Sequence, residues 1–146
     1  MSTAPDFVVR APNEGLVLAV EARNRPNASP EWAAEMRHDL AVRGFLPDAP
    51  FFLLALRDHF FLWKQPPLLQ LVPPDYQAPT REVLRPYLEN LRTPLHEFSK
   101  VGFEAVVGLW LDDLVHGTLN GGSEWLTDSG LRECARNATV VMPAGV

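Results

Sequence analysis

Six consecutive apolar residues, Phe51 to Leu56, constrain the fold of this chain most strongly. The run shows no alternation of apolar and polar residues, so a strand made from it would be buried on both faces. Such a strand lies in the middle of a sheet that is covered by helices. The pair Asp58-His59 then predicts a tight turn into a further strand, Phe60 to Trp63.

The first part of the chain predicts a β-hairpin. Two apolar runs, Phe7 to Val9 and Leu16 to Ala22, stand on either side of Asn-Glu-Gly at 13 to 15, which is a hairpin signal. Alternation in the second strand puts Glu21 and Arg23 on one face with Val17 and Ala19, and puts Leu16, Leu18, Val20 and Ala22 on the other face. Pairing of the two runs would bring Asp6 close to Glu21, so two carboxylates and a cation would meet there.

A helix is predicted from Pro30 to Arg43, because Ser29-Pro30-Glu31 supplies an N-cap, a first-turn proline and a first-turn acid. Its apolar stripe is expected at Trp32, Met36 and Leu40, whereas Arg37 is expected on another face. The order strand, strand, helix, strand, strand is typical of an α/β or α+β protein.

A second amphipathic helix ends at Gly117, which is a C-terminal stop signal. Its apolar residues step by three and four positions, so the stripe must be buried; they are Phe103, Val106, Val107, Trp110, Leu111 and Leu114. After Asn120-Gly121-Gly122, a short helical stretch around Gly130 to Asn137 is expected to lead into a last edge strand, Ala138 to Met142.

Residues 65–79 form a proline-rich segment that cannot hold a helix or a central strand, since it contains five prolines. We expect an extended crossing segment. Its apolar residues, Leu68, Leu69, Leu71 and Val72, would either cover the core of the domain or serve as a strap that binds a partner.

The composition fits one domain, 1–146, with a net charge of -5. A net-negative protein has no global field that attracts nucleic acid, so such contact requires a local basic patch. The nearby candidates are Arg10, Arg23, Arg25, Arg37 and Arg43. The single cysteine, Cys134, is expected to be a small buried residue of a helix, and the chain carries no secretory signal or membrane segment, which fits a cytoplasmic protein without membrane contact.

Pro5-Asp6, followed by a hairpin and by Glu21-Ala22-Arg23, resembles the signature of the restriction-endonuclease-like, or PD-(D/E)XK, superfamily, with Arg23 where that pattern has lysine. The stretches 29–37 and 51–64 are similar to the helix and following strand pair of small bacterial members. The resemblance implies a single restriction-endonuclease-like domain, a mixed sheet flanked by helices. Family members usually carry a helix before the first strand, and its place would be taken here by the C-terminal helices, a second copy or a partner chain.

The resemblance implies that Asp6 and Glu21 hold Mg²⁺ and that Asp6, Glu21 and Arg23 are the catalytic residues, with Arg23 in the water-positioning role. Arginine stays protonated, so it stabilises a phosphate but is a poor proton acceptor. We therefore favour a nuclease-like module with weak or lost phosphodiester hydrolysis that acts in a bacterial assembly, as a homodimer or with a partner protein. The alternative is an active Mg²⁺-dependent nuclease that binds nucleic acid.

Two plainer hypotheses stay open beside these. A glutamate and an arginine two residues apart on a strand are often a solvated pair at a sheet edge. A small-molecule binder that uses the end of the sheet as a pocket is the other, although no specific residue points to it.

Overall fold

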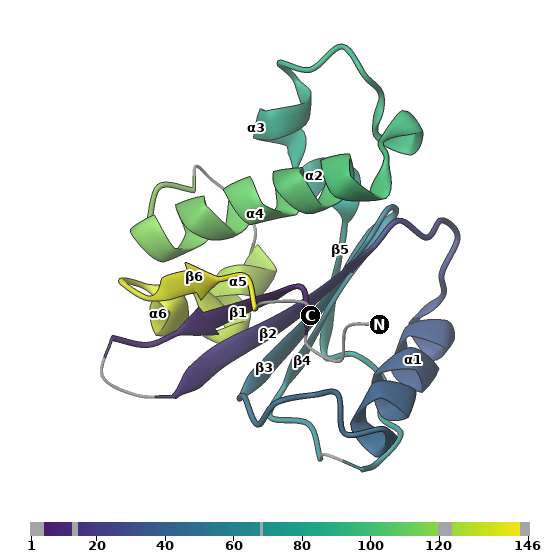
Figure 1. Ribbon diagram of the computed structural model, residues 1–146, viewed down its shortest axis with the longest axis vertical. Coiled ribbons are helices and arrows are strands. Elements are labelled where there is room, and N and C mark those ends of the chain that lie inside the picture. The colour runs from purple at the N-terminus through teal and green to yellow at the C-terminus, as the bar shows by residue number, and fades with distance from the viewer. Residues whose placement is uncertain (1–4, 13–14, 68, 120–123, 144–146) are drawn as a thin grey trace.

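The computed structural model describes residues 5–12, 15–67, 69–119 and 124–143. Its centre is a six-stranded mixed sheet in the order β5-β4-β3-β2-β1-β6 (Figure 1). Strands β2 and β3 are parallel, and the other neighbours are antiparallel. The strands are β1 (Phe7–Arg10), β2 (Leu16–Arg23), β3 (Phe51–Leu56), β4 (His59–Lys64), β5 (Tyr76–Pro79) and β6 (Thr139–Val141).

Strand β3 is the central strand that the sequence predicts. It lies between β2 and β4, and all six of its residues are buried. The predicted hairpin pairing of β1 with β2 is also confirmed, although residues 13 and 14 of its turn lie outside the described residues. The mixed α/β class is therefore confirmed.

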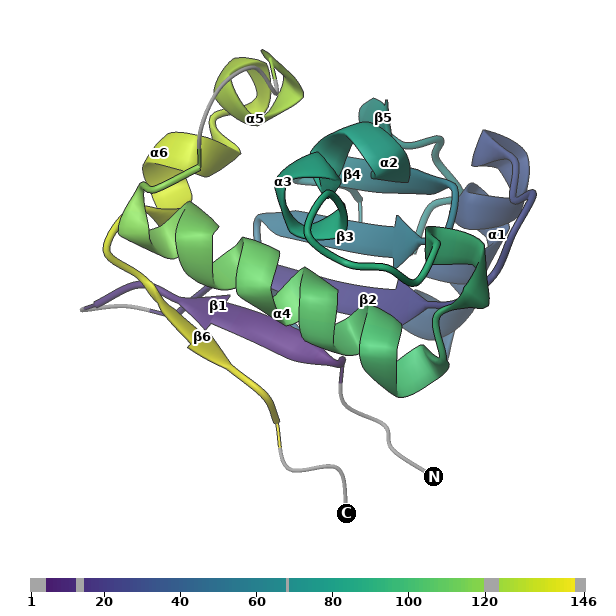
Figure 2. The same ribbon diagram turned by 90° about the horizontal axis from the view of Figure 1, so that it is seen from above.

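Helices cover both faces of the sheet (Figures 1 and 2). Helix α1 (Pro30–Val42) lies on one face, where Ser29 caps it by accepting a hydrogen bond from the Trp32 N–H. The long helix α4 (Lys100–His116) lies on the opposite face and ends at Gly117, whose φ of 70° is left-handed. The shorter helices on that side are α2 (Thr80–Val83), α3 (Arg85–Leu88), α5 (Glu124–Ser129) and α6 (Leu131–Ala135), and a 3₁₀ turn spans Leu95–Glu97.

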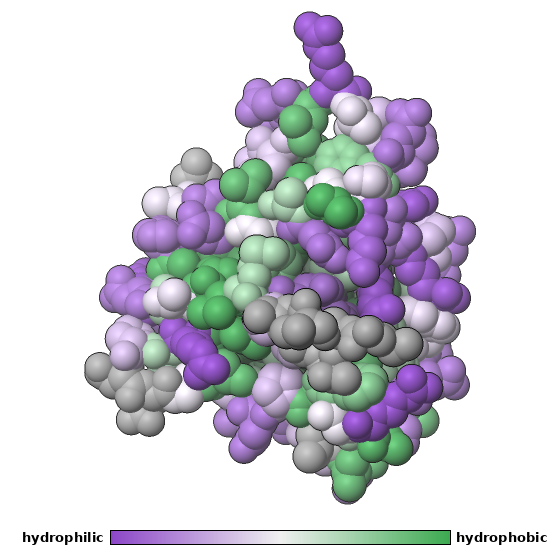
Figure 3. All heavy atoms as spheres, viewed as in Figure 1, coloured by the Kyte–Doolittle hydropathy of each residue, from purple (hydrophilic) through white to green (hydrophobic). Residues whose placement is uncertain are grey.

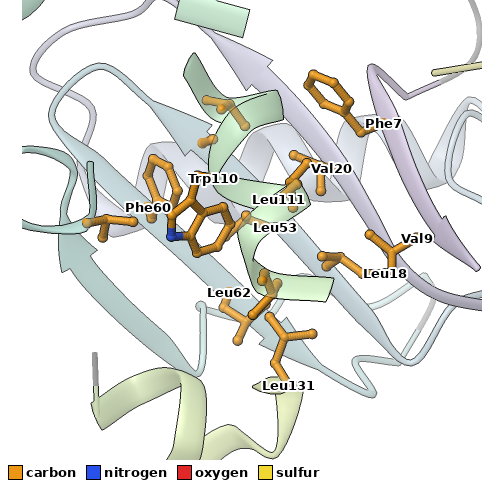
Figure 4. Close-up of a cluster of buried hydrophobic side chains, with 14 of the residues drawn as sticks. Phe7, Val9, Leu18, Val20, Leu53, Phe60, Leu62, Trp110, Leu111 and Leu131 are labelled. Carbon is orange, nitrogen blue, oxygen red and sulfur yellow. The ribbon is translucent and has the colours of Figure 1, made fainter. Parts of the chain in front are cut away.

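The larger core lies between α4 and the sheet (Figure 4). Trp110 is 1% exposed and meets the Phe60 ring edge-on, with centroids 5.3 Å apart, while Trp125 of α5 stacks on it at 6.0 Å. The predicted core positions Val106, Trp110 and Leu114 are all buried.

Helix α1 turns a different face to the sheet from the predicted one. Leu40 is buried as expected, but Trp32 and Met36 are only partly buried and Arg37 is fully buried. Ala33 and Arg37 are the residues that α1 buries against the sheet, so the contact stripe passes through them, and the larger Trp32 and Met36 flank it.

Strand β2 contains an irregularity that changes the predicted alternation. The register with β1 shifts between Val9 and Arg10, so Arg10 pairs with Leu16 and Val17 is the extra residue. Val17 therefore belongs to the core under α4 instead of sharing a face with Ala19. Alternation holds for the rest of the strand, because Leu18, Val20 and Ala22 face α4.

The proline-rich segment divides its apolar residues between core and solvent. Val72 packs on the core beside α1, but Leu69 and Leu71 are exposed, and Leu68 lies outside the described residues. Residues 76–79 of the segment form the edge strand β5. The expectation of a buried Cys134 is wrong, because this residue lies on the exposed side of the short α6.

Apolar surface also gathers over the region of α4 and β6 (Figure 3). The exposed apolar residues of this region are Val101 and Leu109 of α4 and Met142, which directly follows β6. Within the described ranges, no helix has the length and apolar character needed to cross a membrane.

Candidate functional site

Asp6 is held directly before β1 by the backbone of the neighbouring strand. Since Phe7 pairs with Val20, Asp6 falls beside the next residues of β2. Its Oδ2 accepts a hydrogen bond of 2.8 Å from the Ala22 N–H. The carboxylate therefore satisfies a backbone donor just beyond the end of the β1–β2 ladder.

Glu21 is a buried acid in the middle of the sheet. It pairs with Leu54 of β3, and its side chain is only 12% exposed. It shares the α1 face of β2 with Ala19. Burial, a hydrogen bond with Asp6 and the charge of Asp6, in that order of size, raise the pKa of Glu21 to about 7, and Arg23 opposes the rise. Glu21 therefore holds its proton to a higher pH than an exposed glutamate does.

Arg23 lies next to Glu21 on the same face of β2. Its Nη2 is 3.3 Å from Glu21 Oε2, and its side chain is 46% exposed. The structure therefore brings Asp6, Glu21 and Arg23 together. Their catalytic and metal-binding roles stay predictions.

A third carboxylate, Glu104 of α4, lies within electrostatic reach of Asp6. Burial is the main cause that raises the pKa of Glu104, the charge of Asp6 adds to it, and Lys100 opposes it with its Nζ 3.8 Å away. Sequence reasoning missed this residue, because its approach to Asp6 depends on how α4 packs. Gly108, one turn further on, permits that packing: a Cβ there would lie 3.3 Å from the Phe7 ring.

Two polar side chains tie the ends of the parallel strands to the loop before α4. Arg57, directly after β3, donates from Nε to Asn24 Oδ1 at 2.8 Å. Asn24, directly after β2, donates to the Phe98 carbonyl, also at 2.8 Å. Arg57 therefore lies at the same end of the sheet as the acid pair, and the sequence did not single it out.

The basic patch that the sequence predicted is mostly dispersed. Arg37 is buried, Arg43 pairs with Asp39 at 3.2 Å on the surface, and Arg10 lies at the opposite end of β1 from Asp6. Arg25 stacks over the Trp32 ring, 4.1 Å from its centroid.

Asp6 and Glu21 are the two interacting carboxylates of this site that could hold a cation. Mg²⁺ binds proteins through one or two carboxylates and keeps several waters, so a pair of acids is a sufficient donor set. Larger clusters are absent: no group of three or more His, Cys, Asp or Glu in the described part of the chain could hold a metal ion.

Comparison with protein-family models, with curated proteins and with solved structures found no match to this chain.

Proposed function

We propose that this chain is a nuclease-like domain of the restriction-endonuclease-like type, with weak or lost phosphodiester hydrolysis, that acts as an interaction module. The observation that carries the proposal is the environment of Glu21. Its side chain is only 12% exposed and lies 3.3 Å from the Arg23 guanidinium, and its pKa is raised to about 7. The proton and the arginine both reduce the negative charge of the site near neutral pH, which weakens its attraction for a divalent cation.

Arg23 adds a second reason for slow hydrolysis. Its guanidinium stays protonated, so it cannot take a proton from an attacking water. Only a bound metal ion could then generate hydroxide, by lowering the pKa of its own water. The same ion would have to displace the proton of Glu21 and loosen its contact with Arg23.

The arrangement of the elements supports the proposed architecture. Strand β2 leads through α1 into the parallel strand β3, which matches the stretches that carry the resemblance. Helix α4 covers the opposite face of the sheet, and β6 pairs with the outer edge of β1. In the proposed architecture, these C-terminal elements would take the place that family members usually give to a helix before the first strand.

The surface supports an interaction role. The net charge of -5 opposes approach by a polyanion. Exposed apolar side chains include Leu69 and Leu71 on the proline-rich segment, and Val101, Leu109 and Met142 near α4 and β6. Apolar surface that gathers over one region, as it does near α4 and β6 in Figure 3, is typical of contact sites for proteins.

An active Mg²⁺-dependent nuclease is the second candidate, and the closeness of Asp6 to Glu21 favours it. Two carboxylates that raise each other's affinity for a proton also form a preorganised cation site, because a divalent ion replaces the proton and relieves the repulsion. In this candidate Asp6 and Glu21 hold the ion and Arg23 contacts the phosphate.

The first test is calorimetric titration of Mg²⁺ and Mn²⁺ into wild type and Asp6→Ala near pH 7, in two buffers that differ in ionisation enthalpy. If the ion occupies the acid pair, binding releases the proton of Glu21, so the measured heat depends on the buffer. We expect weak binding, with the buffer dependence lost in Asp6→Ala.

The second test incubates single- and double-stranded DNA and RNA with the protein and either ion. The proposal expects weak or no cleavage by wild type and by Arg23→Lys. Glu21→Ala is the site variant, and Glu35→Ala, at an exposed position of α1, is the matched control. Efficient cleavage by wild type and by Glu35→Ala that disappears in Glu21→Ala would overturn the proposal in favour of the active nuclease.

A further inference from the structure

Helix α4 carries a second apolar stripe, on the side that faces away from the sheet. Val101, Ala105 and Leu109 are spaced by four residues, so they lie in successive turns on one face of the helix. Val101 is 75% exposed, Leu109 is 57% exposed and Ala105 is exposed as well. The large buried residues of α4, such as Trp110, belong to the core under the helix. The three exposed residues are called the outer stripe below.

The outer stripe has no cover in the described part of the chain. Figure 2 shows α4 lying over β1 and β2, and none of the other described helices crosses over it in that view. A helix that packs on one side only is usually polar on the other side. Single exposed apolar residues are ordinary, but three of them in successive turns form a continuous ridge of the kind that packs against another helix.

The charges beside the outer stripe change sign along α4. Lys100, with a side chain that is 68% exposed, begins the helix, and Asp112, with a side chain that is 65% exposed, lies near its end. Each has a partner only within α4: Lys100 lies 3.8 Å from Glu104 and Asp112 lies 3.6 Å from His116. Surface pairs of this kind are weak and leave both charges open to further contacts. The helix dipole has the same direction, positive at the start and negative at the end.

A second α4, laid antiparallel on the first, would match both the stripe and the charges. With a two-fold axis beside Ala105, Val101 of each copy meets Leu109 of the other. The small Ala105 side chains let the helix axes approach to about 8 to 10 Å. Lys100 then falls within about 3 Å, measured along the axis, of Asp112 in the other copy. The two Asp112 carboxylates stand about 21 Å apart along the axis, whereas a parallel pair of helices would place them side by side.

We propose that this chain forms a homodimer by antiparallel packing of α4 on the α4 of a second copy, along the outer stripe. The homodimer rests on the interaction role proposed above and gives that role a partner, but its interface uses none of Asp6, Glu21 and Arg23. A monomeric result would therefore leave the metal-binding and cleavage tests unaffected. Because the stripe is short and each copy carries a net charge of -5, the dimer should form at micromolar concentrations, and dilute protein should be monomeric.

Sedimentation velocity of the whole chain, from low to high micromolar concentration, measures the dimer. Ala105→Glu should weaken it at least about tenfold, because the two-fold axis brings the two new carboxylates together. Val42→Glu is the matched control: it makes a similar change at a 61% exposed position at the end of α1 and should leave the dimer unchanged. Circular dichroism checks that both variants fold.

A charge exchange tests which ends of the two helices meet. Lys100→Glu and Asp112→Lys should each weaken the dimer about three- to tenfold, and the double variant should recover most of the wild-type affinity. The two positions are about 18 Å apart on one helix, so they cannot compensate each other within a single copy.

Cysteine cross-linking tests the orientation directly. In a Cys134→Ser background, which removes the exposed native thiol, Ala105→Cys should form a disulfide-linked dimer under mild oxidation. Val101→Cys should not, because its two copies lie about 12 Å apart along the axis. Wild type that stays monomeric throughout, or a dimer that Ala105→Glu leaves intact, would refute the homodimer. A double charge variant without recovery, or Val101→Cys that links as readily as Ala105→Cys, would refute the antiparallel packing.

Discussion

Replacing Glu21 by glutamine should make the stability of the protein less dependent on pH. The pKa of Glu21 is about 7 in the folded protein against 4.5 for the free side chain, so the folded state binds more protons between these values. The sign follows directly: stability contributed by Glu21 is fully present below pH 4.5 and falls as the pH rises through about 7. Above that pH, a buried carboxylate is charged in both states and its full penalty remains.

The size of the effect comes from the same two values. Their separation corresponds to about 3 kcal/mol if the carboxyl group were completely shielded from water. Partial solvent access reduces this, so we expect about 1 to 2 kcal/mol. Glutamine keeps the shape and the hydrogen-bonding capacity toward Asp6 but cannot acquire the charge.

Urea unfolding of wild type and Glu21→Gln, between about pH 5 and about pH 8, measures this difference. The variant should gain stability relative to wild type as the pH rises, and the gain should level off above neutral pH. Glu35→Gln, at an exposed position, controls for the loss of a net charge. A difference between Glu21→Gln and wild type that is constant across the range would show that Glu21 is already ionised at low pH, and the reasoning about its burial would fail.

Two further changes test the packing. Trp110→Ala should lower the free energy of unfolding by about 3 to 5 kcal/mol in urea titration, because it empties the space between Phe60 and Trp125. Leu109→Ala, at a 57% exposed position of the same helix, should cost less than about 0.5 kcal/mol. Similar losses in the two variants would contradict the assignment of the faces of α4. Thr80→Val should cost about 1 to 3 kcal/mol by thermal or urea unfolding, because Thr80 Oγ1 donates to the buried Leu56 carbonyl at 2.6 Å, and Thr80→Ser, which keeps the donor, should restore part of that loss.

The sequence predicted those parts of the fold in which a local pattern is compatible with only one buried face or one position in the sheet. The apolar run of β3 has no polar face to turn outward, and the stripe of α4 with Gly117 after it fixes both the buried face and the end of that helix. The face of α1 was missed, because the sequence offers both the Trp32 stripe and the Ala33 stripe, and only the packing of α1 against the rest of the fold selects the second. Helix α5 was missed because it is too short to show a period.

The candidate site, too, could be predicted from the sequence only in part. Alternation along β2 predicted that Glu21 and Arg23 share a face, and the hairpin predicted that Asp6 lies beside them. Two other features arise from contacts between segments that are distant in the sequence. One is the bulge at Val17, which changes the alternation of β2, and the other is the approach of Glu104 to Asp6. No pattern of spacing in the sequence records these contacts.

The position of β2 explains why its acid has an unusual pKa. A glutamate at the edge of a sheet keeps its water, but β2 lies between β1 and β3, so Glu21 loses solvent whatever its chemical role is. Arg23, two residues away, partly offsets the burial of the Glu21 carboxylate, because its long side chain reaches Glu21 while nearly half of it stays in solvent. A cation that enters the site therefore competes with a proton and with an arginine at once. For this reason, the affinity of Asp6 and Glu21 for a divalent ion should rise between about pH 6 and about pH 8, as Glu21 loses its proton. The affinity of a site made of exposed carboxylates should change little over the same range, because such carboxylates have already lost their protons.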